Sequence, residues 1–403
     1  MTAHPAEPAA AARARALLMD TYRRQPLSIV SGRGVRVIDS DGRELIDLVA
    51  GIAVNVLGHG HPAVVGALER QARLLVHTSN LYYTEPQLAL AERLVASAFP
   101  SRVFFCNSGA EANETAIKLA RAWGRLRRKG AHTVITAETA FHGRTLGALA
   151  ATGNPQYREK FEPLPAGFVR VPFNDASALA GAIDDSTCAV MLEPIQGESG
   201  VVPLDAGLLG EIRRLCDEAD VLLILDEVQS GMGRTGAWWA HQHERIRPDV
   251  MTVAKGLGAG IPIGAVLANP RADVFEPGDH GCTFGGSPLA CAVGCAVMDT
   301  VADDGLMENA VEVGEVLRNR LAAMAREGAP IKALRGRGLM IGVALDAPIA
   351  GAVAHAALDE GVLVNVIGDS ILRLVPPLVL TREEAEAAMD LLSRAFASTR
   401  VPA

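Results

Sequence analysis

Short apolar runs alternate with longer helical stretches between residues 86 and 254, and no other feature of the sequence constrains the fold as strongly. The helical stretches include PQLALAERLVASAF (86–99) and TAIKLARAWGRLRR (115–128). The apolar runs lie at residues 103–106, 132–137, 188–194, 221–227 and 249–254. This order is typical of a mostly parallel sheet that is covered by helices on both faces. The sequence therefore predicts an α/β fold that binds ligands beyond the carboxyl ends of its strands.

The segments on either side of this region predict a second, smaller unit. VRVIDSDGRELIDL (35–48) has the character of a hairpin around an Asp-Gly turn, and residues 289–306 predict a long, largely buried helix. An α+β tail follows, with helices near 307–327 and 381–398 and strands near 339–345, 362–366 and 371–375. We therefore expect a large α/β domain over residues 61–300 and a small α+β domain over 301–403. Residues 1–60 are expected to pack with the small domain.

Bulk properties exclude several classes of protein. The formal net charge of the 403-residue chain is −8, which argues against nucleic acid as a partner. No apolar run approaches the ~20 residues of a membrane span. The first 20 residues lack a continuous apolar stretch, so no secretory signal is expected, and Glu7 argues against a transit peptide. A frayed tail running into a short helix, in a cytoplasmic protein, is the favoured interpretation.

The cysteines and histidines predict neither disulfides nor a metal site. The six cysteines contain no CxxC pair, which favours small buried thiols in a reducing compartment. HGH (59–61) and HQH (241–243) lack the i, i+4 spacing of a helical zinc pair. We therefore expect no metal.

Two strands of the predicted sheet end in charged residues. VLLILDE (221–227) ends in Asp226 and Glu227, and a carboxylate there is costly unless a positive group meets it. Lys255 ends DVMTVA and has no charged neighbour in sequence from Met251 to Asn269. Desolvation would lower its pKa and prepare it for Schiff-base chemistry, although a lysine paired with a buried acid is the plainer alternative. Pyridoxal phosphate between the two would form an imine with Lys255 and present its protonated ring nitrogen to Asp226.

A phosphate and a flat ring need further contacts, and two turns could supply them. In VFFCNSGAEANETAIKLAR (103–121), Ser108, Gly109 and Ala110 lie where a strand gives way to a helix whose first amides can bind phosphate. The alternative is an ordinary capping box. In FHGRT (141–145), Phe141 could stack on the ring and Arg144 could bind a carboxylate, or they could be a core Phe and a surface Arg.

These motifs together resemble the class III (subgroup II) aminotransferases, which are pyridoxal-phosphate enzymes of fold type I. The likeness covers nearly the whole chain and includes GIAVNVLGHGHP, SNLYYTEPQ, NSGAEANETAIKLAR, FHGRT, EPIQGESG, LDEVQSGMGRTG, VAKGLGAGIPIGA, HGCTFGGSPLAC, RGRGLMIG and LRLVPPLVL. The combination is highly specific.

The resemblance implies a cofactor role for eight of the residues matched. Lys255 would be the Schiff-base lysine and proton carrier, and Asp226 the partner of the ring nitrogen. Val228 would pack under the ring, and Gln229 would contact the ring hydroxyl. The other four are the phosphate turn at Gly109 and Ala110, the stacking ring of Phe141, and Thr283, which would reach the phosphate of a neighbouring subunit in an obligate homodimer.

It also implies a substrate site. Arg144 would hold the substrate carboxylate, and Arg373 would be a second carboxylate clamp. Glu198 would neutralise Arg373 for a donor that reacts through its side-chain amine and swing away for a dicarboxylate. Cys282, Ser287 and Ser199 depart from the pattern of the family. Cys282 and Ser199 leave the choice of substrate in doubt, because Cys282 replaces the Ser or Thr expected at a contact position.

The implied reaction is a ping-pong transamination in the cytoplasm, a step of arginine biosynthesis. N2-acetyl-L-ornithine and 2-oxoglutarate would give N-acetyl-L-glutamate 5-semialdehyde and L-glutamate. Succinylornithine, ornithine or GABA as the amino donor remains open, as does assembly of dimers into tetramers.

The sequence offers two alternative classes of protein. Gly231-Met-Gly-Arg-Thr-Gly236 matches the GxGxxG dinucleotide motif and would suggest an NAD-dependent oxidoreductase. However, Asp226 and Glu227 would repel a pyrophosphate, and no clear helix is predicted after Gly236. A PLP-binding regulatory or chaperone-like protein without turnover is the other alternative.

Overall fold

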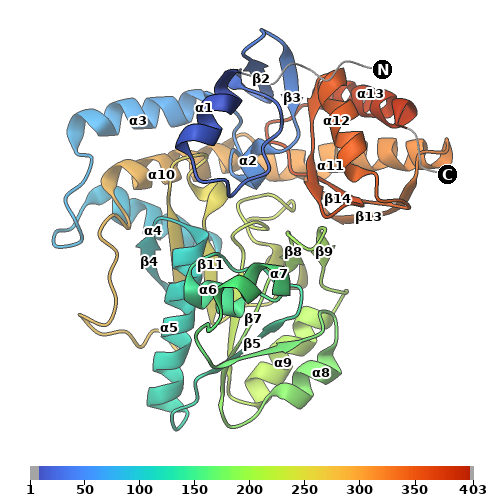
Figure 1. Ribbon diagram of the computed structural model, residues 1–403. Helices are drawn as coiled ribbons and strands as arrows, with labels where there is room; N and C mark the ends of the chain where they lie inside the picture. Colours follow the sequence, from blue (N-terminus) through green and yellow to red (C-terminus); the bar gives the residue numbers. More distant parts are fainter. Residues whose placement is uncertain (1–8, 400–403) are drawn as a thin grey trace.

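The computed structural model describes residues 9–399, and a seven-stranded sheet lies at the centre of its lower half as drawn in Figure 1. In spatial order the strands are β4 (Arg102–Cys106), β12 (Gly264–Ala268), β11 (Val250–Val253), β10 (Leu222–Asp226), β7 (Thr187–Leu192), β5 (Thr133–Ala137) and β6 (Phe168–Val171). Pairing is parallel from β11 through β6, while β12 runs antiparallel to both of its neighbours. The predicted mostly parallel α/β sheet is therefore confirmed.

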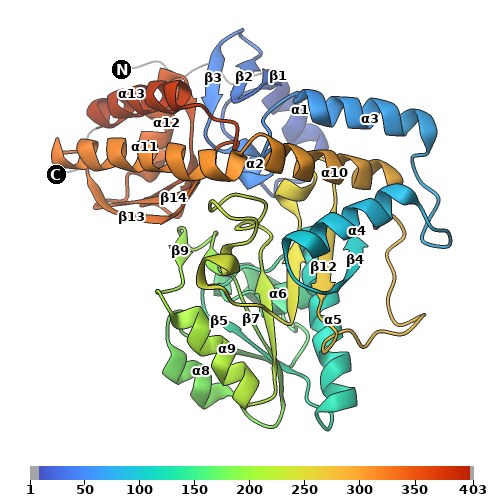
Figure 2. The same ribbon diagram turned by 180° about the vertical axis from the view of Figure 1, so that it is seen from behind.

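Helices cover both faces of this sheet, because successive side chains of each strand point to opposite sides. In β10, Leu222 and Ile224 join the cluster under α5 (Gly109–Arg127), whereas Leu223 and Leu225 join the cluster under α9 (Leu208–Glu218). The helix α8 (Ala176–Ala182) packs beside α9 on that second face (Figure 2). A strand buried on both sides explains the unbroken apolar run in the sequence.

The connections at the carboxyl ends of the strands hold most of the short elements. These are α6 (Leu146–Ala151), α7 (Pro155–Arg158), η1 (Glu159–Phe161), β8 (Ile195–Gln196), β9 (Val202–Pro203), η2 (Ala240–Glu244) and η3 (Lys255–Leu257). Three longer helices cross above the sheet and pack together: α3 (Pro62–Leu74), α4 (Glu85–Ser97) and α10 (Pro288–Asp303).

The two ends of the chain form the upper half of the molecule in both views (Figures 1 and 2). The first segments are α1 (Ala9–Leu17), β1 (Ile29–Arg33), β2 (Arg36–Asp39), β3 (Glu44–Asp47) and α2 (Ala50–Ala53). The last are α11 (Leu306–Arg326), β13 (Ile331–Arg337), β14 (Met340–Leu345), α12 (Ala350–Glu360), β15 (Val362–Leu363), β16 (Asn365–Ile367), β17 (Ile371–Leu374) and α13 (Arg382–Ser398). The strand β3 pairs in parallel with β15, so the N-terminal hairpin shares a sheet with the C-terminal segment.

Most predicted elements are present, with some differences. The five apolar runs coincide with β4, β5, β7, β10 and β11, and the 35–48 hairpin is β2 and β3. The run at 362–366 is not one strand, because β15 and β16 belong to different sheets. The strands β1, β6, β8, β9, β12 and β13 were not predicted. The domain boundaries after residues 60 and 300 remain predictions, and residues 1–8 of the expected N-terminal tail lie outside the described residues.

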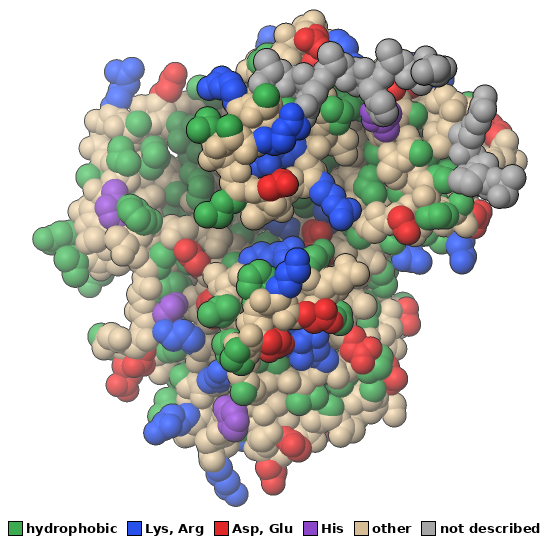
Figure 3. Space-filling view, in the orientation of Figure 1, with side chains coloured by type: hydrophobic (Ala, Val, Ile, Leu, Met, Phe, Trp, Pro, Cys, Tyr) green, Lys and Arg blue, Asp and Glu red, His purple; other side chains and the backbone are tan. Residues whose placement is uncertain are grey.

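The sequence predicted neither a nucleic-acid partner nor a membrane span. In the view of Figure 3, acidic and basic side chains are interspersed without a dominant basic patch. Within residues 9–399, no helix has the length and apolar character needed to cross a bilayer.

Candidate active site

A cavity of about 370 Å³ lies beyond the carboxyl ends of β10 and β11. Nine of the thirteen predicted site residues line it: Ser108, Gly109, Ala110, Phe141, Arg144, Asp226, Val228, Gln229 and Lys255. These residues come from four separate connections of the sheet. The remaining four, Glu198, Cys282, Thr283 and Arg373, lie outside this lining.

Asp226 is buried at the end of β10 and meets two polar groups that the sequence interpretation did not include. Its Oδ2 accepts hydrogen bonds from Asn113 Nδ2 at 2.7 Å and pairs with His142 Nδ1 at 2.8 Å. Its Oδ1 accepts a bond from the Val228 amide at 3.0 Å. Burial lowers the pKa of His142, but the hydrogen bond and the charge of Asp226 outweigh this effect and raise the pKa overall. The carboxylate is therefore held in a fixed orientation by three donors.

Lys255 opens the short helix η3 directly after β11. Among the described residues, its Nζ has no hydrogen-bond or ion-pair partner, so the alternative of a lysine paired with a buried acid is not what the structure contains. Burial lowers the pKa of Lys255, and Arg373 adds to this effect while Glu198 and Asp226 oppose it. The backbone at Lys255 has φ +42°, a conformation that costs about 1 kcal/mol or more for a residue with a side chain. An amine with a lowered pKa, which makes no hydrogen bond or ion pair with any described residue, thus faces the cavity.

The turn that begins α5 combines a helix cap with an open anion site. Ser108 Oγ accepts a bond from the Glu111 amide at 3.2 Å, and Glu111 Oε2 accepts one from the Asn107 amide at 2.6 Å. The first helical amides, at Gly109 and Ala110, have no intrahelical acceptor. A Cβ atom on Gly109 would lie 2.7 Å from Val228 Cγ1, so only glycine allows this close approach. Ser108 caps the helix, but the capping box is not formed, because Glu111 accepts from the Asn107 amide instead of the Ser108 amide. Neither of these bonds uses the amides of Gly109 and Ala110.

Arg144 is exposed at the edge of the cavity. Its guanidinium carbon lies 3.9 Å from the ring centroid of Tyr157 and 5.6 Å from that of Phe141. Within the described part of the chain it forms no ion pair with Asp or Glu. The two aromatic rings orient a cation that still has all of its hydrogen-bond donors available.

Arg373 and Glu198 form an ion pair next to the cavity. Arg373 Nη1 lies 2.6 Å from Glu198 Oε1 and 3.1 Å from Gln229 Oε1, and Asn365 Oδ1 accepts bonds from Nε and Nη2 at 2.9 and 2.7 Å. Only 1% of the Arg373 side chain is exposed, against 24% for Glu198. Burial raises the pKa of Glu198, but the positive charges of Arg373 and Lys255 outweigh this effect. The pKa of Glu198 is therefore lowered overall. The predicted pair is therefore formed, and Gln229 connects it to the cavity wall.

Glu193 is a third buried acid of the site and was not predicted. Its two carboxylate oxygens accept bonds from the Phe141 amide at 3.0 Å and the Gly197 amide at 3.2 Å. Burial raises the pKa of Glu193 to about 7, with the charge of Asp226 adding to the effect and that of His142 opposing it. One carboxyl group thus ties the turn of Phe141 to the turn of Glu198.

Cys282 and Thr283 lie on a long connection outside the cavity. Cys282 Sγ accepts a bond from Asn107 Nδ2 at 3.1 Å, whereas Thr283 is exposed and lines a separate hollow with Glu111, Glu114 and His280. The other departures from the family pattern have local partners: Ser287 Oγ caps α10 at Ala290, and Ser199 Oγ donates to Gln196 Oε1. The proposed contacts of Cys282 and Thr283 therefore stay predictions.

Two signals could have revealed the residues that were missed. His142 stands inside the quoted FHGRT motif next to Phe141, and Asn113 lies four residues after Gly109, on the same side of the helix. The dinucleotide interpretation is wrong, because residues 227–239 form turns and the next helical element is the short η2 rather than a helix after Gly236.

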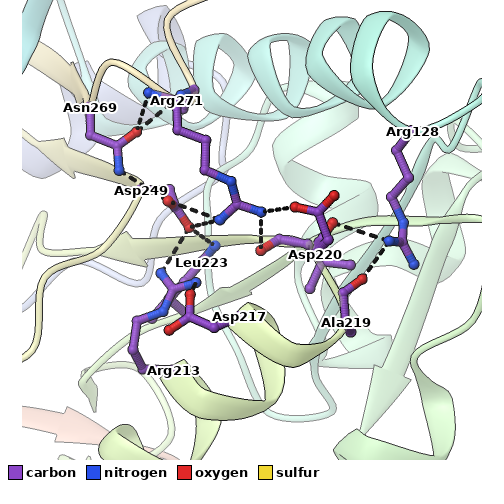
Figure 4. Close-up of polar contacts among 11 residues, drawn as sticks. Arg128, Arg213, Asp217, Ala219, Asp220, Leu223, Asp249, Asn269 and Arg271 are labelled. Carbon is purple, nitrogen blue, oxygen red and sulfur yellow. Dashed lines mark hydrogen bonds and ion pairs between the residues drawn. The ribbon is translucent and has the colours of Figure 1, made fainter.

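A separate polar network lies at the amino ends of the same strands (Figure 4). Asp249, just before β11, accepts bonds from the Leu223 amide and from Arg213 at 2.8 Å and from Asn269 at 3.0 Å. Arg271 lies 3.3 Å from the same carboxylate and 2.7 Å from Asp220. This network is at the opposite end of β10 and β11 from the cavity, so it bears on stability rather than on ligands.

Comparison with known proteins gives consistent matches over nearly the whole chain. The family model for class-III aminotransferases matches residues 19–396. An acetylornithine aminotransferase of Caldanaerobacter subterraneus subsp. tengcongensis is 49% identical over 384 residues, which is 95% of this chain and 98% of that protein. The N-acetylornithine aminotransferase structure from Stenotrophomonas maltophilia is 42% identical with a TM-score of 0.82, covering 94% and 97% of the two chains. The ornithine aminotransferase structure from Toxoplasma gondii is 34% identical with a TM-score of 0.93, covering 96% and 94%.

Proposed function

The chain belongs to the class-III aminotransferases, and on this premise we propose that it transfers the side-chain amino group of N2-acetyl-L-ornithine to 2-oxoglutarate. The products are N-acetyl-L-glutamate 5-semialdehyde and L-glutamate, and the reaction is a step of arginine biosynthesis. The observation that carries the choice of substrate is the 49% identity to an acetylornithine aminotransferase over 95% of the chain. The ornithine aminotransferase structure from Toxoplasma gondii is less similar in sequence, at 34% identity.

Enzymes of this class use pyridoxal phosphate, and the residues of the cavity fit that cofactor on three observations. The first turn of α5 offers free amides to a phosphate, and Gly109 leaves space that a Cβ would fill. Asp226 lies buried with its orientation fixed by Asn113 and His142. Lys255 lines the cavity, and within residues 9–399 its amine has no hydrogen-bond or ion-pair partner. When bound, the cofactor supplies an aldehyde for amine exchange and a protonated ring that accepts electrons.

Each residue around the cofactor has a separate role. Lys255 is the base that removes a proton from the carbon bearing the reacting amine, and burial, which lowers its pKa, favours that role. Asp226 would keep the ring nitrogen protonated through its negative charge. Val228 and Phe141 would pack against the ring, and Gln229 would contact its hydroxyl. Ser108, Gly109 and Ala110 would hold the phosphate.

The two arginines divide substrate recognition. Arg144, which has no acidic partner among the described residues, holds the substrate carboxylate in both half-reactions. Arg373 binds the second carboxylate of 2-oxoglutarate or glutamate after Glu198 has moved away. While N-acetylornithine reacts, Glu198 neutralises Arg373, so that no buried cation is left unpaired. Cys282, near Asn107, is assigned only a minor contact.

The proposal includes a homodimer that shares its active sites, in the cytoplasm. Thr283 is exposed and outside its own cavity, as a residue that serves a neighbouring subunit must be. Apolar side chains gather near it, with Leu81 82% and Phe284 63% exposed. Such a surface favours burial against a second copy. All six cysteines are free, which fits a reducing compartment.

A comparison of amino donors tests this function. We expect kcat/KM with 2-oxoglutarate to be higher for N-acetylornithine than for ornithine or GABA. The expected ping-pong kinetics give parallel lines in double-reciprocal plots of rate against the amino donor at several concentrations of 2-oxoglutarate. A preference for ornithine or GABA would contradict the proposed substrate while leaving the aminotransferase assignment intact.

A further inference from the structure

The connection from β12 to α10, residues 269–287, leaves the body of the molecule as a long loop on one side (Figures 1 and 2). It carries Thr283 and, three residues earlier, His280, which has no part in the chemistry described above. Thr283 itself forms no hydrogen bond with any described residue. The position of its hydroxyl therefore depends on how the rest of the loop is held.

His280 fixes one side of this turn to α5. Its Nδ1 lies 2.8 Å from Lys118 Nζ, and its Nε2 lies 2.9 Å from Thr115 Oγ1. The ring also stacks near Phe104, with 4.8 Å between centroids. Lys118 Nζ donates a further bond to the carbonyl oxygen of Asp279 at 3.3 Å. The loop is thus attached to the helix by both a side chain and the backbone.

These contacts define the protonation state of the imidazole. The ammonium of Lys118 can only donate, so Nδ1 of His280 is the acceptor. The hydroxyl of Thr115 donates to the Glu111 carbonyl at 2.9 Å, so it accepts from Nε2–H of His280. Burial lowers the pKa of His280, the charge of Lys118 lowers it further, and that of Glu114 opposes this. A neutral ring with its proton on Nε2 satisfies every contact.

Amide side chains hold the other side of the turn. Asn80 Nδ2 donates to the carbonyl oxygens of Cys282 and Gly285 at 3.1 and 2.9 Å. Gln87 Nε2 donates to Asn80 Oδ1 at 2.7 Å and to the Gly286 carbonyl at 3.3 Å. The carbonyls on both sides of Thr283 are therefore bound, which restricts the backbone on which the threonine sits.

We propose that His280, held by Lys118 and Thr115, is a positioning residue that presents Thr283 to the cofactor phosphate of the second subunit. This inference rests on the proposed homodimer with shared sites. The helix α5 would then contact two active sites. Its first amides, at Gly109 and Ala110, face the cavity of its own subunit, and Thr115 and Lys118 hold the loop that serves the second subunit. Loss of the imidazole would leave the chemistry at Lys255 intact and weaken retention of the cofactor.

A double-mutant cycle tests this role. We measure the dissociation constant of pyridoxal phosphate by titrating the full-length apo dimer with His280→Asn, Thr283→Ala and the combination. Each single variant is expected to weaken binding about tenfold, the effect of about 1.4 kcal/mol. The combination is expected to be no weaker than Thr283→Ala alone, because coupled residues do not add. Independent, additive effects would overturn the positioning role.

A second variant tests the same role without changing His280 itself. Lys118 is exposed, so Lys118→Met removes the donor to Nδ1 with little risk to the fold, and Lys129→Met, at another exposed lysine, is its matched control. Hydrogen exchange of the holoenzyme is expected to accelerate at residues 281–286 in Lys118→Met and to stay unchanged in Lys129→Met. Equal protection in both variants would contradict the inference.

The outcomes also separate this inference from the proposed function. A monomeric protein, or unchanged cofactor binding in Thr283→Ala, would refute the shared site and the role of His280 with it. Weak binding in Thr283→Ala combined with normal binding in His280→Asn would refute the role of His280 alone.

Discussion

Arg373 Nη1 and Glu198 Oε1 lie 2.6 Å apart, although the two residues are 175 positions apart in the chain, Arg373 on β17 and Glu198 in the turn between β8 and β9. The arginine is buried and has four further polar contacts, to Asn365 twice, to Gln229 and to the Gly197 carbonyl. Glu198 is the more exposed partner and has one further contact, with Gln229 at 3.4 Å. The geometry thus makes the arginine the fixed element and the glutamate the one that can leave.

Removing the charge at Glu198 should change substrate preference. In Glu198→Gln, Arg373 is no longer neutralised, so the ratio of kcat/KM for N-acetylornithine to that for glutamate should fall about tenfold, as expected for loss of one charge-assisted contact. Steady-state kinetics of both half-reactions measure this ratio. Glu218→Gln, which removes an exposed acid paired with Arg214, is the control. An unchanged ratio would show that Glu198 is not the switch.

Lys255→Ala should abolish transamination while the protein remains folded. Loss of the base and of the covalent attachment should lower kcat at least about 10³-fold. Circular dichroism should be unchanged, and bound pyridoxal phosphate should become removable by dialysis. Transamination near the normal rate in this variant would rule out the assignment of Lys255.

Replacing Arg144 by lysine keeps the positive charge but removes the planar pair of donors that binds a carboxylate. We expect kcat/KM to fall about 100-fold for N-acetylornithine, and by a similar factor for glutamate, because the same clamp serves both. Stopped-flow measurement of each half-reaction tests this. A loss confined to one of the two substrates would show that Arg144 does not hold both.

The stability of the apo protein should fall as the pH rises from 5 to 8. Glu193 has a folded pKa raised from 4.5 to about 7, so its contribution is complete below pH 4.5 and is lost as the pH rises through 7. The raised pKa of His142 acts in the same direction. Urea unfolding at fixed protein concentration should give a flatter pH profile in Glu193→Gln than in the wild type. Profiles of equal slope would contradict a protonated Glu193.

The Asp249 network should support stability and not catalysis. In Asp249→Asn, the guanidinium groups of Arg213 and Arg271 lose a buried partner, and we expect unfolding to require about 3 kcal/mol less free energy. In the control Asp220→Asn, an exposed carboxylate is lost and the change should be at most about 1 kcal/mol. Chemical denaturation measures both. A lowered kcat in folded Asp249→Asn would show unexpected coupling to the active site.

Local sequence patterns were sufficient for much of the fold. The apolar runs of β5, β7, β10 and β11 are continuous because these strands are buried on both faces, and the sequence alone shows such a run. The strand β12 could not be recognised in the same way. Its segment GAVLA follows a glycine-rich turn and is too rich in small residues to be distinguished from a loop.

The sequence by itself determined the class of chemistry, because a lone lysine and an acid at the ends of adjacent buried strands must meet at one edge of the sheet. Only the tertiary structure decided what surrounds them. His142 and Asn113 orient Asp226, and Glu193 binds the turn of Phe141, through contacts between residues 52 to 113 positions apart. No local pattern encodes such contacts, since they depend on which connections of the sheet converge at one edge.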